Sequence, residues 1–169
     1  MSEMPDMNNA ESDAATGLAA RASYAIHRRL EAPAPAHDRI QLDHLQREKG
    51  RLRVRSEAGA EVRVFLERGR TLQVGEVLAS DCGRLFEVVA APETVIRAHT
   101  RDWLQFARAC YHLGNRHVKL EVGECWLRIT PDHVLRDMLE QLGLATHEEC
   151  APFVPEAGAY ARVRHEHAH

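Results

Sequence analysis

The chain has 169 residues, 44% of them hydrophobic, which is enough to bury a sizeable core in one domain or in two small ones. Its 22 basic and 25 acidic residues give a net charge of −3, so the overall field does not favour nucleic acid. No apolar run reaches the ~20 residues of a membrane helix, and the amino-terminal stretch has no hydrophobic region typical of a secretory signal. These properties predict a cytoplasmic protein that binds neither membranes nor nucleic acid.

The first half of the chain is predicted to be an extension followed by a small β domain. Residues 1–21 are rich in Ser, Asp, Asn and Ala and are expected to be disordered. The alternating Ala-Pro stretch at 32–36 predicts a stiff extended segment. From there to about residue 91, short alternating runs between turn residues predict an antiparallel β domain. Its clearest strands are 52–55 and 62–66 around a turn at 56–59, and 76–78 and 85–89 around a turn at 81–83.

Basic side chains alternate along one stretch of this β domain. Five of them would share one face if the stretch were extended: Arg47, Lys49, Arg51, Arg53 and Arg55. No aromatic residue is interleaved to stack bases, which argues against nucleic-acid binding. A solvated strand face or a surface that docks an acidic protein partner is the better interpretation.

The pattern changes after Pro92 from strands alone to strands and helices. A strand is predicted at 94–98, and a helix then begins with Thr100 as its N-cap and ends at Gly114. Apolar residues recur along this helix at helical spacing and predict its buried stripe: Trp103, Leu104, Ala107, Cys110 and Tyr111. Two strands, at 118–122 and 125–129, follow around a Gly-Glu turn.

A second helix is predicted with Thr130 as its N-cap, Pro131 in its first turn and Gly143 after its last turn. Its predicted buried stripe is Val134, Leu135, Met138, Leu139 and Leu142. A last strand is expected through 150–153. The order β-α-β-β-α-β is that of the ferredoxin-like split βαβ unit. The predicted fold class is therefore α+β, with a small all-β domain followed by a ferredoxin-like domain.

The four cysteines give no sign of a sulfur-based site. Cys82, Cys110, Cys125 and Cys150 are scattered, without a Cys-x-x-Cys pair or zinc-ribbon spacing. We expect them to be small buried hydrophobic residues. A metal site in this chain should therefore be built from nitrogen.

Histidine is the residue type that stands out. The chain has 11 histidines, and four of them fall within its last 23 residues: His147, His165, His167 and His169. Two more, His112 and His117, flank the predicted end of the first helix. Neutral imidazole is a good ligand for Zn, Cu, Fe and Ni. The pattern therefore predicts a protein that holds a metal ion.

Three motifs resemble the family of urease accessory protein E, the nickel metallochaperones. They are Ala109-Cys-Tyr-His-Leu-Gly-Asn-Arg-His-Val118, Asp132-His-Val-Leu-Arg-Asp-Met-Leu139 with Leu142-Gly-Leu144, and Ala151-Pro-Phe-Val-Pro-Glu156. The resemblance runs from about residue 22 to the end of the chain. It implies a partner-binding β domain over 22–91, a ferredoxin-like metal-binding domain over 92–157 and a flexible histidine-bearing tail over 158–169.

The resemblance implies that His117 is the principal nickel ligand and that it meets its symmetry mate at a homodimer interface. A two-fold axis beside one imidazole supplies a second identical ligand, because an isologous interface brings the same residue from both chains. The tail would fill further positions with His165, His167 and His169. Such a site is fixed on one side and mobile on the other, so it can open to release its ion more readily than a closed four-ligand site.

The other histidines have simpler interpretations beside the metal-binding one. Without the family context, His117 could be a capping or backbone-bonding histidine. His112 lies in the last turn of its helix, where the dipole favours a cation, and its family position implies an auxiliary ligand. His133 lies in the first turn of the second helix and is free to coordinate or to form hydrogen bonds. Some family members carry a histidine two residues earlier, where this chain has Pro131, so a peripheral site at His133 is doubtful.

The leading hypothesis is a non-catalytic carrier that receives Ni²⁺ and passes it, through an accessory GTPase, to apo-urease. It would work as a homodimer, or as two dimers around one ion, and Zn²⁺ or Cu²⁺ would also bind the site in vitro. The alternative is a peptide-binding or holdase module of a maturation complex in which metal binding is incidental. A metal-dependent hydrolase is disfavoured, because the sequence has no His-Glu-x-x-His element, Gly-rich phosphate loop or nucleophile motif.

Overall fold

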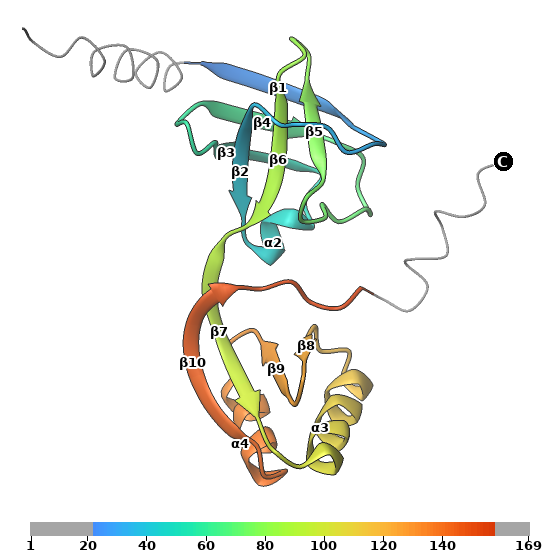
Figure 1. The fold of residues 1–169 in the computed structure, drawn as a ribbon, viewed down its shortest axis with the longest axis vertical. Coiled ribbons are helices and arrows are strands. Elements are labelled where there is room, and N and C mark those ends of the chain that lie inside the picture. The colour runs from blue at the N-terminus through green and yellow to red at the C-terminus, as the bar shows by residue number, and fades with distance from the viewer. Residues whose placement is uncertain (1–21, 158–169) are drawn as a thin grey trace, which may run out of the picture. The chain divides into compact units, whose positions relative to one another are not determined.

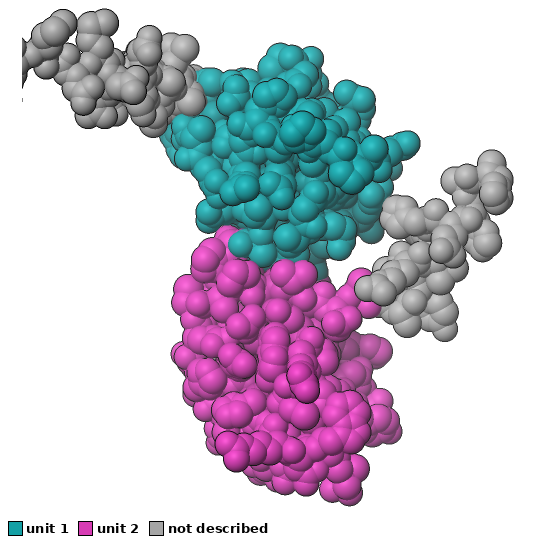
Figure 2. All heavy atoms as spheres, viewed as in Figure 1, with its two compact units in different colours: residues 1–90 teal, residues 91–169 magenta. Residues whose placement is uncertain are grey.

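The computed structural model describes residues 22–157, which belong to two compact units divided after Ala90 (Figures 1 and 2). The N-terminal unit is built on a six-stranded sheet in the order β2-β6-β5-β1-β4-β3. Its elements are β1 (Ser23–Arg29), β2 (Asp38–Leu42), α2 (His44–Arg47), β3 (Arg51–Arg55), β4 (Glu61–Phe65), β5 (Val77–Ser80) and β6 (Leu85–Ala90).

The two predicted hairpins are present, but the prediction of a purely antiparallel domain is wrong. Strands β3 and β4 pair antiparallel, as do β5 and β6. However, β1 pairs parallel with β4, and β2 pairs parallel with β6. A tight turn forces antiparallel pairing only between strands that it joins, and β1 and β2 are joined to their partners by long connections. A bridge between Ile40 and Ser56 brings the edge strand β2 to the end of β3, so the sheet closes on itself.

The core of this unit comes from alternate positions of its strands, as the period-2 pattern requires. Its buried apolar side chains include Ile26, Ile40, Val62, Val64, Leu78, Phe86 and Val88. On β3, Leu52 and Val54 pack against this core, whereas Arg51, Arg53 and Arg55 are exposed. The prediction that five basic residues share one exposed face is wrong for Arg47, which ends helix α2 and is only 4% exposed. The exposed cations of β3 form what we call the arginine face: Arg51, Arg53 and Arg55.

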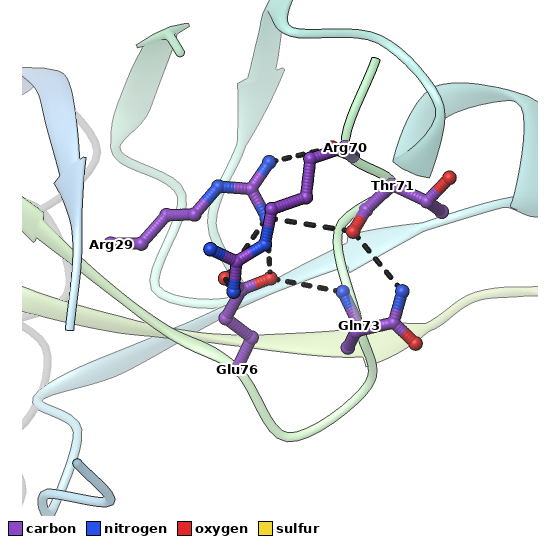
Figure 3. A network of polar contacts seen from close by, with 5 residues as sticks. All are labelled: Arg29, Arg70, Thr71, Gln73 and Glu76. Atoms are coloured by element: carbon purple, nitrogen blue, oxygen red, sulfur yellow. Dashed lines mark hydrogen bonds and ion pairs between the residues drawn. The ribbon is translucent and has the colours of Figure 1, made fainter. Parts of the chain in front are cut away.

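A buried ion pair holds the loop between β4 and β5 against β1 (Figure 3). Both carboxylate oxygens of Glu76 accept hydrogen bonds from Arg29 Nη1, each at 2.9 Å, and the backbone N–H of Gln73 donates a third at 3.0 Å. Arg29 also donates to the carbonyl oxygens of Arg70 and Thr71 in the same loop. The side chains of Arg29 and Glu76 are only 12% and 8% exposed, so water can compensate little for the loss of either charged partner.

The C-terminal unit has the predicted element order β-α-β-β-α-β. Its elements are β7 (Pro92–His99), α3 (Trp103–Asn115), β8 (Glu121–Gly123), β9 (Trp126–Ile129), α4 (His133–Gln141) and β10 (Ala145–Pro152). The sheet is antiparallel throughout, in the order β10-β7-β9-β8, and β7 and β10 run side by side along its length (Figure 1). Strand β10 begins well before the predicted 150–153, whereas β8 is shorter than the predicted 118–122.

The helices α3 and α4 cover one face of this sheet. The shared core contains Ile96, Ala98, Leu127 and Ile129 from the sheet, Phe106, Ala109 and Leu113 from α3, and Leu139 from α4. The predicted stripe of α4 is correct for Leu135, Met138, Leu139 and Leu142 but wrong for Val134, which is 62% exposed. No helix within residues 22–157 is long and apolar enough to cross a membrane.

Aspartates, rather than the predicted threonines, cap both helices. The carboxylate of Asp102 accepts from the N–H groups of Leu104 and Gln105, and that of Asp132 accepts from Leu135. Thr100 instead accepts from the N–H of Asp102 and so supports the cap from outside the helix. A carboxylate forms charge-assisted hydrogen bonds to these N–H groups and also interacts with the positive end of the helix dipole, which a hydroxyl does less well.

We expect the change Glu76→Gln to destabilise the N-terminal unit by about 3 kcal/mol or more, because it leaves the Arg29 guanidinium buried without a counter-charge. Amide hydrogen exchange in β1 and β5 measures the loss. The matched control is Glu87→Gln, whose partner Arg39 is 58% exposed, and this change should cost roughly 1 kcal/mol or less. Equal, small losses in the two variants would contradict a structural role for the buried pair.

Candidate metal centre

His117 closes the end of helix α3. The predicted stop at Gly114 is wrong, since the helix continues to Asn115 and Arg116 is its C-cap. His117 follows with a φ of 56°, in the left-handed region, and its N–H donates to the Gly114 carbonyl oxygen at 2.9 Å. The next N–H, of Val118, donates to the Leu113 carbonyl oxygen at 3.1 Å. These two hydrogen bonds, with Leu113 and Val118 in the same apolar cluster, make a Schellman motif.

This motif explains both the position of the imidazole and the shortness of β8. The left-handed conformation is uncommon for a residue with a side chain, although His is among the types that tolerate it. The backbone of His117 is fixed by the two hydrogen bonds, whereas its side chain is exposed. Val118 and Leu120 pack against the core instead of extending β8. The result is an imidazole on a rigid support that projects from the helix end.

Helix α3 has two apolar faces, and the predicted stripe is mostly the outer one. Phe106, Ala109 and Leu113 are buried in the core. By contrast, Trp103, Leu104 and Tyr111 are 68%, 55% and 65% exposed, so the prediction that they are buried is wrong for the single chain. At 100° per residue the two sets lie on different sides of the helix. We call the exposed set, Trp103, Leu104 and Tyr111, the outer face of α3.

Of the remaining predicted ligands, the structure describes His112 and His133. His112 is half-buried in the last turn of α3, with its ring edge-on to Tyr111 at 5.5 Å. His133 is the first residue of α4 and is exposed. His165, His167 and His169 lie outside the described residues. Within residues 22–157 no three His, Cys, Asp or Glu side chains already form a group that could hold a metal ion.

The cysteines are less buried than predicted. Cys82 and Cys150 are exposed, and Cys110 and Cys125 are half-buried. Cys82 lies in the turn between β5 and β6, where turn backbone rather than core surrounds it. A side-chain hydrogen bond with Ser80 lowers the pKa of the Cys82 thiol, and a backbone hydrogen bond with Arg84 acts in the same direction. Burial raises the pKa of Cys110.

The sheet face turned away from the helices carries polar and aromatic side chains that the sequence analysis did not single out. The guanidinium groups of Arg97 and Arg128 both lie over the ring of Trp126, at 5.0 and 4.9 Å from its centroid. Arg128 Nε donates to Glu149 at 2.6 Å. Desolvation raises the pKa of Glu149, but the hydrogen bond and charge of Arg128 outweigh it and hold that pKa below its ordinary value. Strict alternation along the strands is the signal that could have placed these residues on one face.

We expect His117→Gly to stabilise the metal-free C-terminal unit by about 1 kcal/mol, because glycine adopts the left-handed conformation without steric cost. The measurement is urea unfolding followed by tryptophan fluorescence, since both tryptophans of the chain, Trp103 and Trp126, lie in this unit. The control His112→Gly places glycine inside the helix and should cost about 1 kcal/mol. A loss of stability in both variants would contradict the assigned backbone strain.

Cys82 should be alkylated by iodoacetamide faster than Cys110 at neutral pH, because a lowered thiol pKa increases the reactive thiolate fraction. Ser80→Ala removes the main cause of the shift, so it should slow the reaction at Cys82 severalfold near pH 7. The two proteins should react alike well above the thiol pKa, where both are fully ionised. If Cys82 reacted at the same rate in the wild type and in Ser80→Ala at every pH, the hydrogen bond with Ser80 would not be the cause of the lowered pKa.

Comparison with known proteins agrees with this architecture. Residues 22–91 match the family model described as the N-terminal domain of UreE urease accessory protein, and residues 93–169 match that of its C-terminal domain. A urease accessory protein UreE from Marinomonas sp. (strain MWYL1) is 56% identical over 136 residues, which cover 80% of this chain and 90% of the relative. Another, from Alteromonas mediterranea, is 46% identical over 130 residues, covering 77% and 84% of the two chains. The chain therefore belongs to the UreE family of urease accessory proteins.

Proposed function

We propose that this protein is a non-catalytic nickel carrier in urease maturation, with His117 as its principal ligand. Family membership supports the role in urease maturation. The assignment of His117 as the ligand rests on one observation: its imidazole is exposed, and its backbone is part of the Schellman motif at the end of α3. Its support is rigid and its side chain is free to coordinate, which suits an ion that must bind and later leave.

We propose that the protein is a homodimer, or a pair of dimers around one ion, formed through the outer face of α3. Large exposed apolar patches, of more than about a few hundred Å², are uncommon on monomers and commonly mark an interface. Trp103, Leu104 and Tyr111 lie on the same helix that His117 terminates. A two-fold axis near the end of α3 would bring the two His117 side chains to one ion, because an isologous interface juxtaposes equivalent residues.

The ion requires further donors, because two imidazoles do not complete the coordination of a divalent metal. We propose that the tail histidines His165, His167 and His169 supply them and that His112 is an auxiliary ligand. His133, the first residue of α4, is the weakest candidate. Some family members carry a second histidine two residues earlier, where this chain has Pro131, which cannot act as a ligand through its side chain. In this proposal residues 92–157 are the ferredoxin-like metal-binding domain, as the strand order β10-β7-β9-β8 supports, and residues 158–169 are the tail.

We propose that the N-terminal unit docks the partners to which the nickel is delivered, an accessory GTPase and apo-urease. The arginine face of β3 supports this role, because exposed guanidinium groups favour an acidic protein surface. The same face would also suit a peptide-binding or holdase module in which metal binding is incidental. That alternative would be favoured if the protein captured its partner equally well with and without nickel, and if the change His117→Gly left urease activation unchanged.

Titration calorimetry with Ni²⁺ tests the ligand assignment. The variant His117→Gly should lose the high-affinity site, with at least a tenfold fall in affinity, while its C-terminal unit stays folded. The control is His27→Ala, which removes an exposed imidazole that is hydrogen-bonded to Asp81 in the other unit and should leave nickel binding unchanged. Replacing the three tail histidines by Ala should lower affinity or stoichiometry without abolishing binding. Unchanged high-affinity binding in His117→Gly would refute the assignment.

Because ligation requires neutral imidazole, nickel affinity should also fall as pH drops through the range in which histidine titrates, about pH 6.5. Copper and zinc should bind the same site in vitro, since ligand type alone does not select nickel.

A further inference from the structure

A pair of histidines faces solvent on the side of the C-terminal sheet opposite the helices. His99 is the last residue of β7, and His147 lies two positions further along β10 than Ala145, the residue paired with His99. Ala98 and Leu127 point into the helix-covered core, so their neighbours His99 and Trp126, which pair across β7 and β9, lie on the other face. His147 pairs with Arg97 and shares that face.

The two imidazoles lie in one hollow and have the spacing of a metal-binding pair. Their ring centroids are 6.0 Å apart and the rings are inclined at 74°. With metal–nitrogen bonds of about 2.0–2.1 Å, a ring centroid lies roughly 3 Å from a bound ion, so two ligating rings stand about 5–6 Å apart. The hollow has a volume of about 400 Å³, and the turn between β8 and β9 adds Glu124 and Cys125 to its lining.

A carboxylate is in place to orient one of the rings. His147 Nε2 is 3.4 Å from a Glu149 oxygen, and Glu149 is itself held by Arg128. Metal-ligating histidines usually donate their other ring N–H to a carboxylate, which fixes the tautomer and turns the free nitrogen toward the ion. In this arrangement Nδ1 of His147 is the nitrogen available for coordination.

Among the described residues that line the hollow, the one Lys or Arg is already in contact with an aromatic ring. Arg97 lines the hollow, and its guanidinium lies over the Trp126 ring. The Trp126 ring packs directly on the backbone of Gly123, where any larger residue would clash, because its Cβ would lie only 2.0 Å from the ring. The hollow therefore combines two imidazoles, a thiol and a carboxylate with a guanidinium that already has an aromatic partner.

We propose that His99 and His147 form a second divalent-metal site, for a borderline ion such as Zn²⁺, that is separate from His117. The two sites are at opposite ends of α3, whose 13 residues span ~20 Å. The pair is open, since no third His, Cys, Asp or Glu within residues 22–157 completes a group with it. Water fills the remaining positions, and an ion held in this way exchanges readily. The proposal does not rest on nickel carriage by His117.

Titration of the full-length protein with Zn²⁺ tests the site. The variant H99A/H147A should bind one Zn²⁺ fewer per chain than the wild type, and it should keep the high-affinity nickel binding assigned to His117. The variant His117→Gly should keep the Zn²⁺ that H99A/H147A loses. The control H27A/H37A removes two exposed imidazoles from the N-terminal unit and should bind as the wild type does. An unchanged Zn²⁺ count in H99A/H147A would overturn the proposal, and so would equal Zn²⁺ counts in His117→Gly and in the triple variant H99A/H117G/H147A.

The change Glu149→Gln provides a second, independent readout. It leaves both imidazoles in place but weakens the acceptor that orients His147, so Zn²⁺ affinity should fall about 10–100-fold while the count of ions stays the same. Tryptophan fluorescence checks that the C-terminal unit remains folded. Unchanged Zn²⁺ affinity in Glu149→Gln would show that the ring is not oriented as proposed and would count against the site.

Discussion

The end of helix α3 is held by two backbone hydrogen bonds, and the geometry of the candidate nickel ligand depends on them. They place His117 in a left-handed conformation, turn the chain back toward the core through Val118, and leave the imidazole exposed. A side chain on a loop would sample many positions before meeting an ion. Here the backbone is fixed first, so that coordination has only the side-chain torsions of His117 to order.

In the C-terminal unit, both the sheet and helix α3 have one face in the core and another face exposed. The residues that stabilise the fold are therefore different from those available for binding. Helix α3 uses Phe106, Ala109 and Leu113 for the core and presents a second apolar face outward. The sheet likewise uses one face for the core and leaves Trp126, His99 and His147 on the other. Because the stabilising contacts lie inside, the outward side chains can serve recognition without having to hold the fold together.

The sequence predicted the elements better than it predicted their surroundings. Hairpins, the two C-terminal helices and the element order followed from local patterns, because turn residues and helical spacing act over a few positions. The parallel pairing of β1 and β2 did not follow, since it depends on contacts between distant segments. The stripe of α3 was misjudged because two apolar faces compete and only the tertiary packing chooses between them. The pairing of His99 with His147 was not predicted, because it depends on the register between two distant strands.

The left-handed residue at the end of α3 has a consequence for how such a protein can be improved or can evolve. A library selected only for resistance to heat would enrich glycine at position 117, since that residue fits the backbone better, and would discard the imidazole unnoticed. A histidine at this place is thus better explained by binding than by stability. Attempts to stabilise the protein should therefore leave His117 unchanged.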